Sequence, residues 1–341
     1  MYSLFDSPSM YDSDTNFCQL RRLLSSIWPQ QVMSTRACQK TSNMILPRFR
    51  QQSSRLWFST RSPASLNEKP ASEYLYGHSA VLAAIKAKKR RIDMLFFQKS
   101  SSSTKTTKKK DATILEDIVQ KNKLPIVYWD KGRMNNLVPD KPHQGYIMKT
   151  SPLDTIDIAY LGPVENGRYA TNKPDVNFTA KNQNKAPFWI ALDEIQDPQN
   201  LGSILRTAYF FQVDGVLLCR KNSAPLSPTV SKVSAGAMEQ MDVHSTASLV
   251  KFLKASSENG WNIMGAAATD QPKQEDAQAP DMDRTKPRIL VLGSEGLGLR
   301  KNVLACCNER ASIPGGMLDP DDVVDSLNVG VAAGILISKL T

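Results

Sequence analysis

The sequence predicts an α/β protein with two successive domains, each with helices covering a sheet. Short apolar runs typical of buried strands alternate with stretches whose apolar residues recur at helical spacing, first over residues 72–150 and again over residues 188–341. The intervening residues 151–187 are rich in Gly, Asn, Pro and Lys and poor in apolar residues, which indicates an extended interdomain linker. In the second domain the alternation favours a mostly parallel sheet.

The first domain begins with a helix initiated by a glycine, with Val81, Leu82 and Ile85 on one face. The elements that follow are a basic turn, a strand over 92–97, a helix over 112–123, and strands from Pro125 and from His143. Residues 98–113 are too polar and too simple in composition to pack, and they predict a mobile surface loop.

The second domain repeats the alternation of strands and helices. Its strands are predicted over residues 188–192, 215–219, 261–265 and 289–292, and in a short run ending at Pro314. Its helices are predicted from Leu201, near Thr229, near Ser248, over residues 301–307, and from Ser326 to the end of the chain.

Length and composition allow one or two domain cores. The chain has 341 residues, and its apolar fraction of 41% is ordinary for a soluble protein. No apolar run reaches the ~18 residues that a membrane span requires. The five cysteines form no C-x-x-C pair and there are only three histidines, so we expect no metal site.

The first 67 residues carry much of the excess positive charge. The whole chain has a formal charge of +10, and residues 1–67 contain eight Lys and Arg against three Asp. No acidic residue lies between Asp14 and Glu68, where arginines are scattered among Ser, Leu and Gln. This composition is typical of a mitochondrial transit peptide, and a start at Met33 would remove all three Asp residues. The alternative is a disordered basic tail that binds RNA or nothing.

The segment DPQNLGSILRTA places polar residues at the start of a helix. Its Asp-Pro pair ends the preceding strand, Asn200 can cap the helix, and Gly202 permits close approach of another backbone or a ligand. Arg206 falls on the first turns of the same helix. Periodicity alone favours a simpler interpretation, in which Asn200 is only a cap and Arg206 only a solvated helix residue.

A second motif, LVLGSEGLGL, runs from a buried strand into Gly293, Gly296 and Gly298, with Glu295 between them. The spacing is G-x-x-G-x-G, whereas dinucleotide-binding loops have G-x-G-x-x-G. The sequence therefore argues against a dehydrogenase.

A third motif has two parts, SIPGG from Ser312 and SLNVGVAAGIL from Ser326. Backbone N–H groups at the start of the apolar C-terminal helix favour an anionic group, either a phosphate or a cofactor carboxylate. Taken alone, Ser326 is equally well an N-cap and Asn328 a first-turn residue.

In this order and at these separations, the three motifs resemble those of the SpoU branch of the SPOUT RNA 2′-O-ribose methyltransferases, over about residues 188–340. The stretch SKVSAGAMEQMDVH from Ser231 fits the same family. Upstream, YLYGHSAVLAAIKAKKRRID and HQGY resemble the ribosomal-protein-L30e-like substrate-binding domain of members that methylate guanosine in large-subunit rRNA. With the leader, the chain is most similar to mitochondrial members.

The resemblance implies a fold, a cofactor and a partner. In this family the C-terminal SPOUT domain contains a trefoil knot, binds S-adenosylmethionine and pairs into a homodimer. By resemblance, the cofactor contacts fall on Gly293, Ile313 and Leu327, with Gly298 and Pro314 shaping the same loops. The catalytic or RNA-positioning residues by resemblance are Asn200, Arg206, Glu295, Ser326 and Asn328.

Three features depart from the family pattern. Residues 315–325 form a longer and more acidic connection than the family has, next to the implied contact at Leu327. Gln212 stands where the family usually has Gly, and another loop is extended from Ala268.

The residue types suit methyl transfer to a ribose hydroxyl. The cofactor supplies the electrophile, so the protein mainly has to orient and activate the hydroxyl. Arg206 can hold the adjacent phosphate through two hydrogen bonds and stabilise a developing alkoxide. It is not suited to act as a general base, because a guanidinium stays protonated above pH ~12.

A basic cluster at the end of the first domain's helix is the predicted RNA contact. Its members are Lys86, Lys88, Lys89, Arg90 and Arg91. Such a cluster attracts phosphates. The alternative is a solvated helix end whose cations interact with the helix dipole, and the family resemblance favours the RNA-binding surface.

Together these features predict an S-adenosylmethionine-dependent 2′-O-ribose methyltransferase of the mitochondrial matrix that acts on a guanosine of large-subunit rRNA. One alternative keeps the chemistry and changes the substrate to mitochondrial tRNA. Another is a non-catalytic RNA-binding assembly factor with the same fold. The intact set of five polar residues argues against the second alternative.

Overall fold

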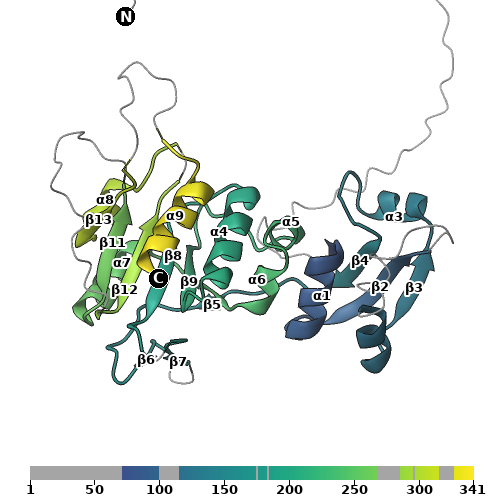
Figure 1. Cartoon of the computed structure of the whole chain (residues 1–341), viewed down its shortest axis with the longest axis horizontal. Coiled ribbons are helices and arrows are strands. Elements are labelled where there is room, and N and C mark those ends of the chain that lie inside the picture. Colours follow the sequence, from purple (N-terminus) through teal and green to yellow (C-terminus); the bar gives the residue numbers. More distant parts are fainter. Residues whose placement is uncertain are drawn as a thin grey trace, which may run out of the picture. The chain divides into compact units, whose positions relative to one another are not determined.

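The computed structural model describes residues 71–99, 115–173, 176–182, 184–267, 285–294, 296–314 and 326–341 (Figure 1). Pro63–Thr341 form one compact unit, and within it we distinguish an N-terminal lobe (residues 71–150) and a C-terminal lobe (residues 151–341). The predicted transit peptide and most of the predicted polar loop lie outside the described residues, so both stay predictions. The same is true of residues 315–325, and the trefoil knot also stays a prediction.

The N-terminal lobe contains a four-stranded sheet in the order β1-β4-β2-β3. Strand β4 is antiparallel to both β1 and β2, whereas β2 and β3 are parallel. The strands are β1 (Glu73–Tyr76), β2 (Ile92–Gln98), β3 (Ile126–Trp129) and β4 (Tyr146–Thr150), and the helices are α1 (His78–Ala87), α3 (Lys131–Leu137) and residues 115–121. The predicted strands and first two helices are confirmed, while β1 and α3 were not predicted.

The C-terminal lobe is built on a seven-stranded sheet in the order β13-β11-β12-β8-β9-β10-β5, and all neighbouring strands are parallel. Every residue of the central strands β8, β9 and β12 is buried, as expected for a parallel sheet covered on both faces. The strands are β5 (Ile156–Asp157), β8 (Phe188–Leu192), β9 (Gly215–Cys219), β10 (Val243–Thr246), β11 (Asn262–Ala266), β12 (Arg288–Leu292) and β13 (Glu309–Ala311).

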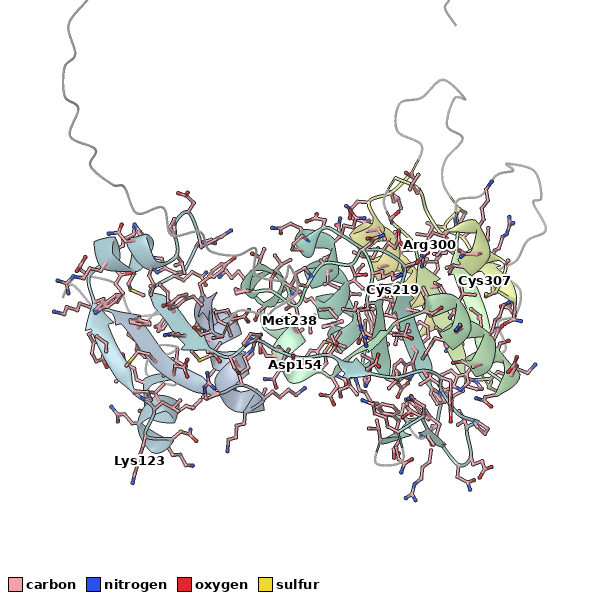
Figure 2. The ribbon with its side chains drawn as sticks, turned by 180° about the vertical axis from the view of Figure 1, so that it is seen from behind. Lys123, Asp154, Cys219, Met238, Arg300 and Cys307 are labelled. Atoms are coloured by element: carbon pink, nitrogen blue, oxygen red, sulfur yellow. The ribbon has the colours of Figure 1, made fainter. Side chains whose placement is uncertain are left out.

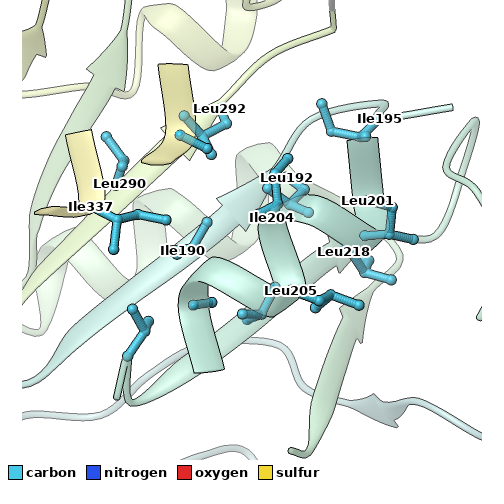
Figure 3. Packing of buried hydrophobic residues seen from close by; sticks show 14 of the residues in the cluster. Ile190, Leu192, Ile195, Leu201, Ile204, Leu205, Leu218, Leu290, Leu292 and Ile337 are labelled. Carbon is cyan, nitrogen blue, oxygen red and sulfur yellow. The ribbon is translucent and has the colours of Figure 1, made fainter. Parts of the chain in front are cut away.

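Helices cover both faces of this sheet. The helices on one face are α4 (Pro198–Phe210), α5 (Pro228–Val233), α6 (Ala237–Gln240) and α9 (Val329–Leu340), and those on the other are α7 (Leu249–Glu258) and α8 (Lys301–Leu304). Ile204 of α4 and Ile337 of α9 pack with Ile190 and Leu290 in the first core (Figure 3). The predicted α/β architecture is confirmed.

Residues 151–187 are not the extended linker that the sequence predicts. They add β5 to the edge of the sheet and form an antiparallel pair, β6 (Arg168–Ala170) and β7 (Asn177–Thr179). Although apolar residues are few here, Leu161 and Tyr169 are buried, and the Trp189 indole N–H donates a 2.8 Å hydrogen bond to the Tyr169 hydroxyl. A small number of large side chains is therefore enough to fold this segment onto the C-terminal lobe.

The backbone conformation at Gln212 explains why the family usually has Gly at this position. Its φ is 57°, a left-handed conformation that glycine adopts without strain. The side chain compensates in part, because its Nε2 atom donates a 3.3 Å hydrogen bond to the Tyr209 carbonyl. The family's glycine at this position is thus accounted for by the backbone.

His244 lies in an aromatic cluster on β10. Its ring centroid is 4.9 Å from that of Trp189 and 5.2 Å from that of Phe178, and the residue is only 1% exposed. Burial lowers the pKa of His244 to about 4, against a smaller opposing effect of the Asp242 carboxylate. The imidazole is therefore neutral in the folded chain at physiological pH.

We expect the stability of the fold to decrease as the pH falls from about 6.5 towards 4. In this window the unfolded chain protonates His244 whereas the folded chain does not, so between pH 7 and pH 5 the free energy of unfolding should drop by about 2 kcal/mol from this residue. Urea denaturation at the two pH values measures the effect. His244→Phe should reduce the drop by that amount, and an unchanged drop would contradict the assignment.

Candidate active site

The candidate site lies at the carboxyl edge of the parallel sheet. The loops that follow β8, β12 and β13 leave the sheet at this edge, because the three strands run in the same direction. Open α/β sheets bind ligands at this edge. All the predicted cofactor-binding and catalytic residues follow one of these strands or lie on α4 and α9.

The structure brings Asn200 and Asn328 together. Asn200 is 6% exposed in the first turn of α4, and its Oδ1 atom accepts a 3.0 Å hydrogen bond from Asn328 Nδ2. Asn200 Nδ2 donates to Asp197 Oδ2 over 3.3 Å. Asn328 is the N-cap of α9, where its Oδ1 accepts a 2.9 Å hydrogen bond from the Gly330 N–H. A chain of side-chain amides thus joins the N-termini of the two helices.

Gly330 permits this close approach. A Cβ atom on Gly330 would lie 2.3 Å from the Ser203 hydroxyl oxygen and 3.5 Å from Asn200 Oδ1. A side chain at this position would require the Ser203 hydroxyl to move or α9 to shift away from α4. The predicted polar set is therefore positioned by helix packing as well as by hydrogen bonds.

Arg206 faces elsewhere. It lies six residues beyond Asn200 on α4, which places it about 120° around the helix from Asn200. Among the described residues no hydrogen bond joins it to Asn200 or Asn328. Its exposed side chain instead lines a cavity of about 500 Å³ with Tyr209, Phe210 and Gln240, and the lining contains no carboxylate.

The loop after β12 is tightly folded. Ser294 N–H donates to the Gly298 carbonyl over 3.1 Å, and Gly298 N–H donates to the Ser294 carbonyl over 2.9 Å. A Cβ atom on Gly293 would lie 2.2 Å from the Gly298 carbonyl carbon, and Gly298 has a φ of 63°. Both glycines are thus required by the shape of the loop. Glu295 lies outside the described residues.

This loop fits a cofactor that binds through backbone groups. Gly298 is exposed at the carboxyl edge, whereas Gly293 is buried against the Gly298 peptide, and the N-terminus of α9 favours an anionic group such as a carboxylate. Ile313 is half-buried against the core, whereas Pro314, Ser326 and Leu327 are exposed. Their contact with a cofactor stays a prediction.

Asp193 and Arg300 are functional candidates that the sequence did not reveal. Asp193 directly follows β8 and is 1% exposed, and Arg300 Nε donates to its two carboxylate oxygens over 2.9 and 3.2 Å. Hydrogen bonding to Asp193 raises the pKa of the Arg300 guanidinium. The only sequence signal is a carboxylate at the end of a fully apolar strand.

The predicted RNA contact at Arg90 is wrong. Arg90 is 6% exposed, and its guanidinium donates 2.7 and 2.9 Å hydrogen bonds to Glu239 on α6 and further ones to Glu73 and the Ser151 carbonyl. Ser231 also donates to Glu239, over 2.8 Å. Arg90 therefore connects the two lobes and has no free donor face for a phosphate.

The other four members of the basic cluster remain at the surface. Lys86 and Lys88 are exposed, whereas Lys89 is paired with Asp242 at 2.6 Å and Arg91 with Asp93 at 2.9 Å. Lys86 and Lys88 are thus the members most available to RNA. Within the described ranges, no helix is long and apolar enough to span a membrane, and no group of three or more His, Cys, Asp or Glu side chains is arranged to hold a metal ion.

Two family models match most of the described chain. The model of the SpoU rRNA Methylase family matches residues 187–338, and the model for RNA 2′-O ribose methyltransferase substrate binding matches residues 74–155. These ranges correspond to the catalytic motifs and to the N-terminal lobe.

Similar proteins include three named rRNA methyltransferase 1, mitochondrial. The Schizosaccharomyces pombe protein is 34% identical, with 80% of this chain and 90% of that protein covered. The human protein is 34% identical, with 79% and 72% covered. The Dictyostelium discoideum protein is 37% identical, and the match covers 68% of this chain but only 45% of that longer protein.

Solved structures share the fold. A putative RNA methyltransferase of the TrmH family from Porphyromonas gingivalis superposes with a TM-score of 0.52 at 24% identity, covering 79% of this chain and 89% of that chain. The SpoU methyltransferase AviRb from Streptomyces viridochromogenes, solved with AdoMet, gives 0.56 at 16% identity, covering 79% and 89%.

We expect Arg90→Ala to destabilise the fold strongly. It leaves the fully buried Glu239 carboxylate without its cation, and breaking a buried pair in this way costs about 3–5 kcal/mol. Chemical denaturation measures the free energy of unfolding. Arg91→Ala is the matched control, since it removes an exposed ion pair next to Arg90 and should cost less than about 1 kcal/mol. Equal effects of the two variants would contradict the assignment.

Proposed function

Because the chain belongs to the SpoU rRNA methylase family, we propose that it transfers the methyl group of S-adenosylmethionine to a ribose 2′-hydroxyl of mitochondrial large-subunit rRNA, at a guanosine. The observation that carries this proposal is the Asn200–Asn328 contact, which joins two of the three motifs at the carboxyl edge of the sheet. The names of relatives from three eukaryotes support the rRNA substrate and a place in the mitochondrial matrix.

The cofactor-binding residues in this proposal are Gly293, Gly298, Ile313, Pro314 and Leu327. When bound, S-adenosylmethionine supplies an electrophilic methyl group, and no metal is needed. Gly293 permits the close packing that shapes the loop after β12, Gly298 exposes its peptide groups, and Ile313 contributes apolar surface. The helix dipole at the start of α9 suits the cofactor's carboxylate, while the Gly330 and Val331 N–H groups donate to Asn328 Oδ1.

The polar set orients the ribose. Arg206 lies on a different face of α4 from the Asn200–Asn328 pair, and from there it binds the phosphate next to the target nucleotide and stabilises negative charge on the attacking oxygen. The Asn200–Asn328 pair, with Glu295 and Ser326, holds the ribose in line with the methyl group. The hydroxyl proton passes to a group other than Arg206, because a guanidinium does not accept a proton at physiological pH.

We also propose that two copies of the chain form a homodimer through the α9 side of the site. Leu327 and Val331 are each 52% exposed, and they lie directly beside Asn328. Contiguous exposed apolar surface marks protein–protein interfaces, and Leu327 and Val331 would contribute to such a surface at the start of α9. Pairing there would also shield the start of α9 from water.

A methyl-transfer assay tests the function. We expect the full-length chain, labelled S-adenosylmethionine and unmodified mitochondrial large-subunit rRNA to give label on a ribose 2′-oxygen. Arg206→Ala should lower the rate about 10²–10³-fold, because it removes a charge stabiliser of the transition state. The rate of Arg206→Lys should lie between those of the unmodified chain and Arg206→Ala, since lysine keeps the charge but loses the paired donors.

The same assay includes a mitochondrial tRNA pool. Label on tRNA alone would keep the mechanism and replace the substrate. RNA binding without transfer to either RNA would favour the assembly-factor alternative. An unchanged rate in Arg206→Ala would end the assignment of that residue.

We expect Val331→Asp to convert the dimer to a monomer, because it places a carboxylate within the proposed apolar interface. Light scattering after size-exclusion chromatography measures the molar mass. Tyr128→Asp is the control, since Tyr128 is similarly exposed, at 46%, on β3 of the N-terminal lobe. A monomeric unmodified chain, or a dimer in Val331→Asp, would contradict this interface.

A further inference from the structure

We propose that Asp193 and Arg300 are positioning residues that fix the loop between Gly293 and Gly298 in its cofactor-binding shape. This inference rests on the proposed function, which makes that loop part of the cofactor site. Neither residue belongs to the polar set or to the predicted cofactor contacts. Arg300 and its neighbour Cys219 are labelled in Figure 2.

Asp193 is a rigid anchor. It follows the central strand β8, its side chain is fully buried, and its N–H donates a 2.8 Å hydrogen bond to the Leu292 carbonyl at the end of β12. The carboxylate is therefore held at the junction of the two strands from which the site's loops depart.

Arg300 ties the far end of the loop to this anchor. Its Nη2 atom lies 2.5 Å from Asp193 Oδ1, and its own N–H donates to Asp193 Oδ2 over 3.3 Å. Nη1 pairs with Glu194 at 3.0 Å. Both the backbone and the side chain of Arg300 are thus bound to the residues that follow β8.

Among the described residues, few other contacts hold the loop between Gly293 and Gly298 in place. Seven residues separate Leu292 from Arg300, and the backbone contact of Gly293 with Gly298 depends on the two ends staying together. Leu299, which follows Gly298, packs against the hydrophobic cluster on the face of the sheet that α7 and α8 cover. In the described part of the chain, releasing the Arg300 side chain would leave the Ser294–Gly298 hydrogen bonds, the packing of Leu299 and the α8 hydrogen bonds to the Arg300 carbonyl to define the loop.

The loss of a purely structural ion pair and the loss of a positioning pair have different effects on stability and cofactor affinity. Loss of a structural pair lowers the stability of the whole chain and leaves the affinity of the folded molecules for cofactor unchanged. Loss of a positioning pair raises the cofactor's dissociation constant and KM while kcat at saturating cofactor changes little.

The experiment compares four variants of the full-length chain. Asp193→Asn keeps the side-chain shape but removes the negative charge, and Arg300→Gln removes the cation. Arg300→Lys keeps the cation but lacks the planar guanidinium that donates to both carboxylate oxygens. Arg220→Gln is the matched control, because Arg220 forms an Asp pair with Asp157 on β5 that does not touch the loop. Calorimetry measures binding of S-adenosylhomocysteine, kinetics measure KM and kcat, and hydrogen exchange follows the amides of residues 293–300.

We expect Asp193→Asn and Arg300→Gln to raise the dissociation constant about 10–100-fold, as loss of a supporting contact does in other sites. KM should rise with it, kcat should stay within about threefold, and exchange should accelerate in residues 293–300 above the rest of the chain. Arg300→Lys should recover part of the affinity, and Arg220→Gln should match the unmodified chain.

Unchanged affinity and unchanged exchange in both variants would overturn the positioning role. Accelerated exchange throughout the chain with unchanged affinity would also overturn it, in favour of a structural pair. Failure of the unmodified chain to bind S-adenosylhomocysteine would instead refute the proposed function, and hydrogen exchange would still decide whether the pair holds the loop.

Discussion

The burial of a parallel sheet on both faces is the constraint on which the C-terminal lobe depends. Strands such as β8 and β9 offer no polar side chains, and β12 has one only at its start, Arg288, so helices have to cover these strands on both sides. The carboxyl edge consequently collects Asp193, the Gly293 loop and the start of α9. The candidate site lies there because its loops leave the sheet at the carboxyl ends of these strands, whereas the polar residues of β10 are buried within the sheet.

Local patterns predicted much of this lobe. Strand β9 has the predicted bounds, because five apolar residues stand between Asp214 and Arg220 and no competing helical period exists. Helix α4 was recognised from its apolar spacing, but it begins at Pro198 with Asp197 as its N-cap, so Asn200 is not the cap that the sequence suggested. Strand β10 was not predicted, because its sequence contains His, Ser and Thr and its burial depends on β5, which comes from a segment that the sequence presents as a linker.

Non-local pairs account for what the sequence could not reveal in the candidate site. Arg90 is one of five clustered basic residues and has no local feature that distinguishes it from Arg91, yet its partner Glu239 is 149 residues away. Asp193 and Arg300 are likewise 107 residues apart. The sequence placed Asn200 and Asn328 in one functional set but did not show that their side chains are in contact. The motif also does not show the helix geometry that directs Arg206 away from them.

The Arg90–Glu239 pair also constrains the order in which the molecule can be completed. A chain is made from its N-terminus, so β2 and α1 exist as polypeptide well before α6 does. Until residue 239 has been synthesised, Arg90 has only Glu73 and backbone to bind and must remain partly hydrated. The N-terminal lobe can therefore fold early, but it can acquire its final surface only when the chain beyond α6 arrives, which makes the last step of its maturation dependent on the catalytic lobe.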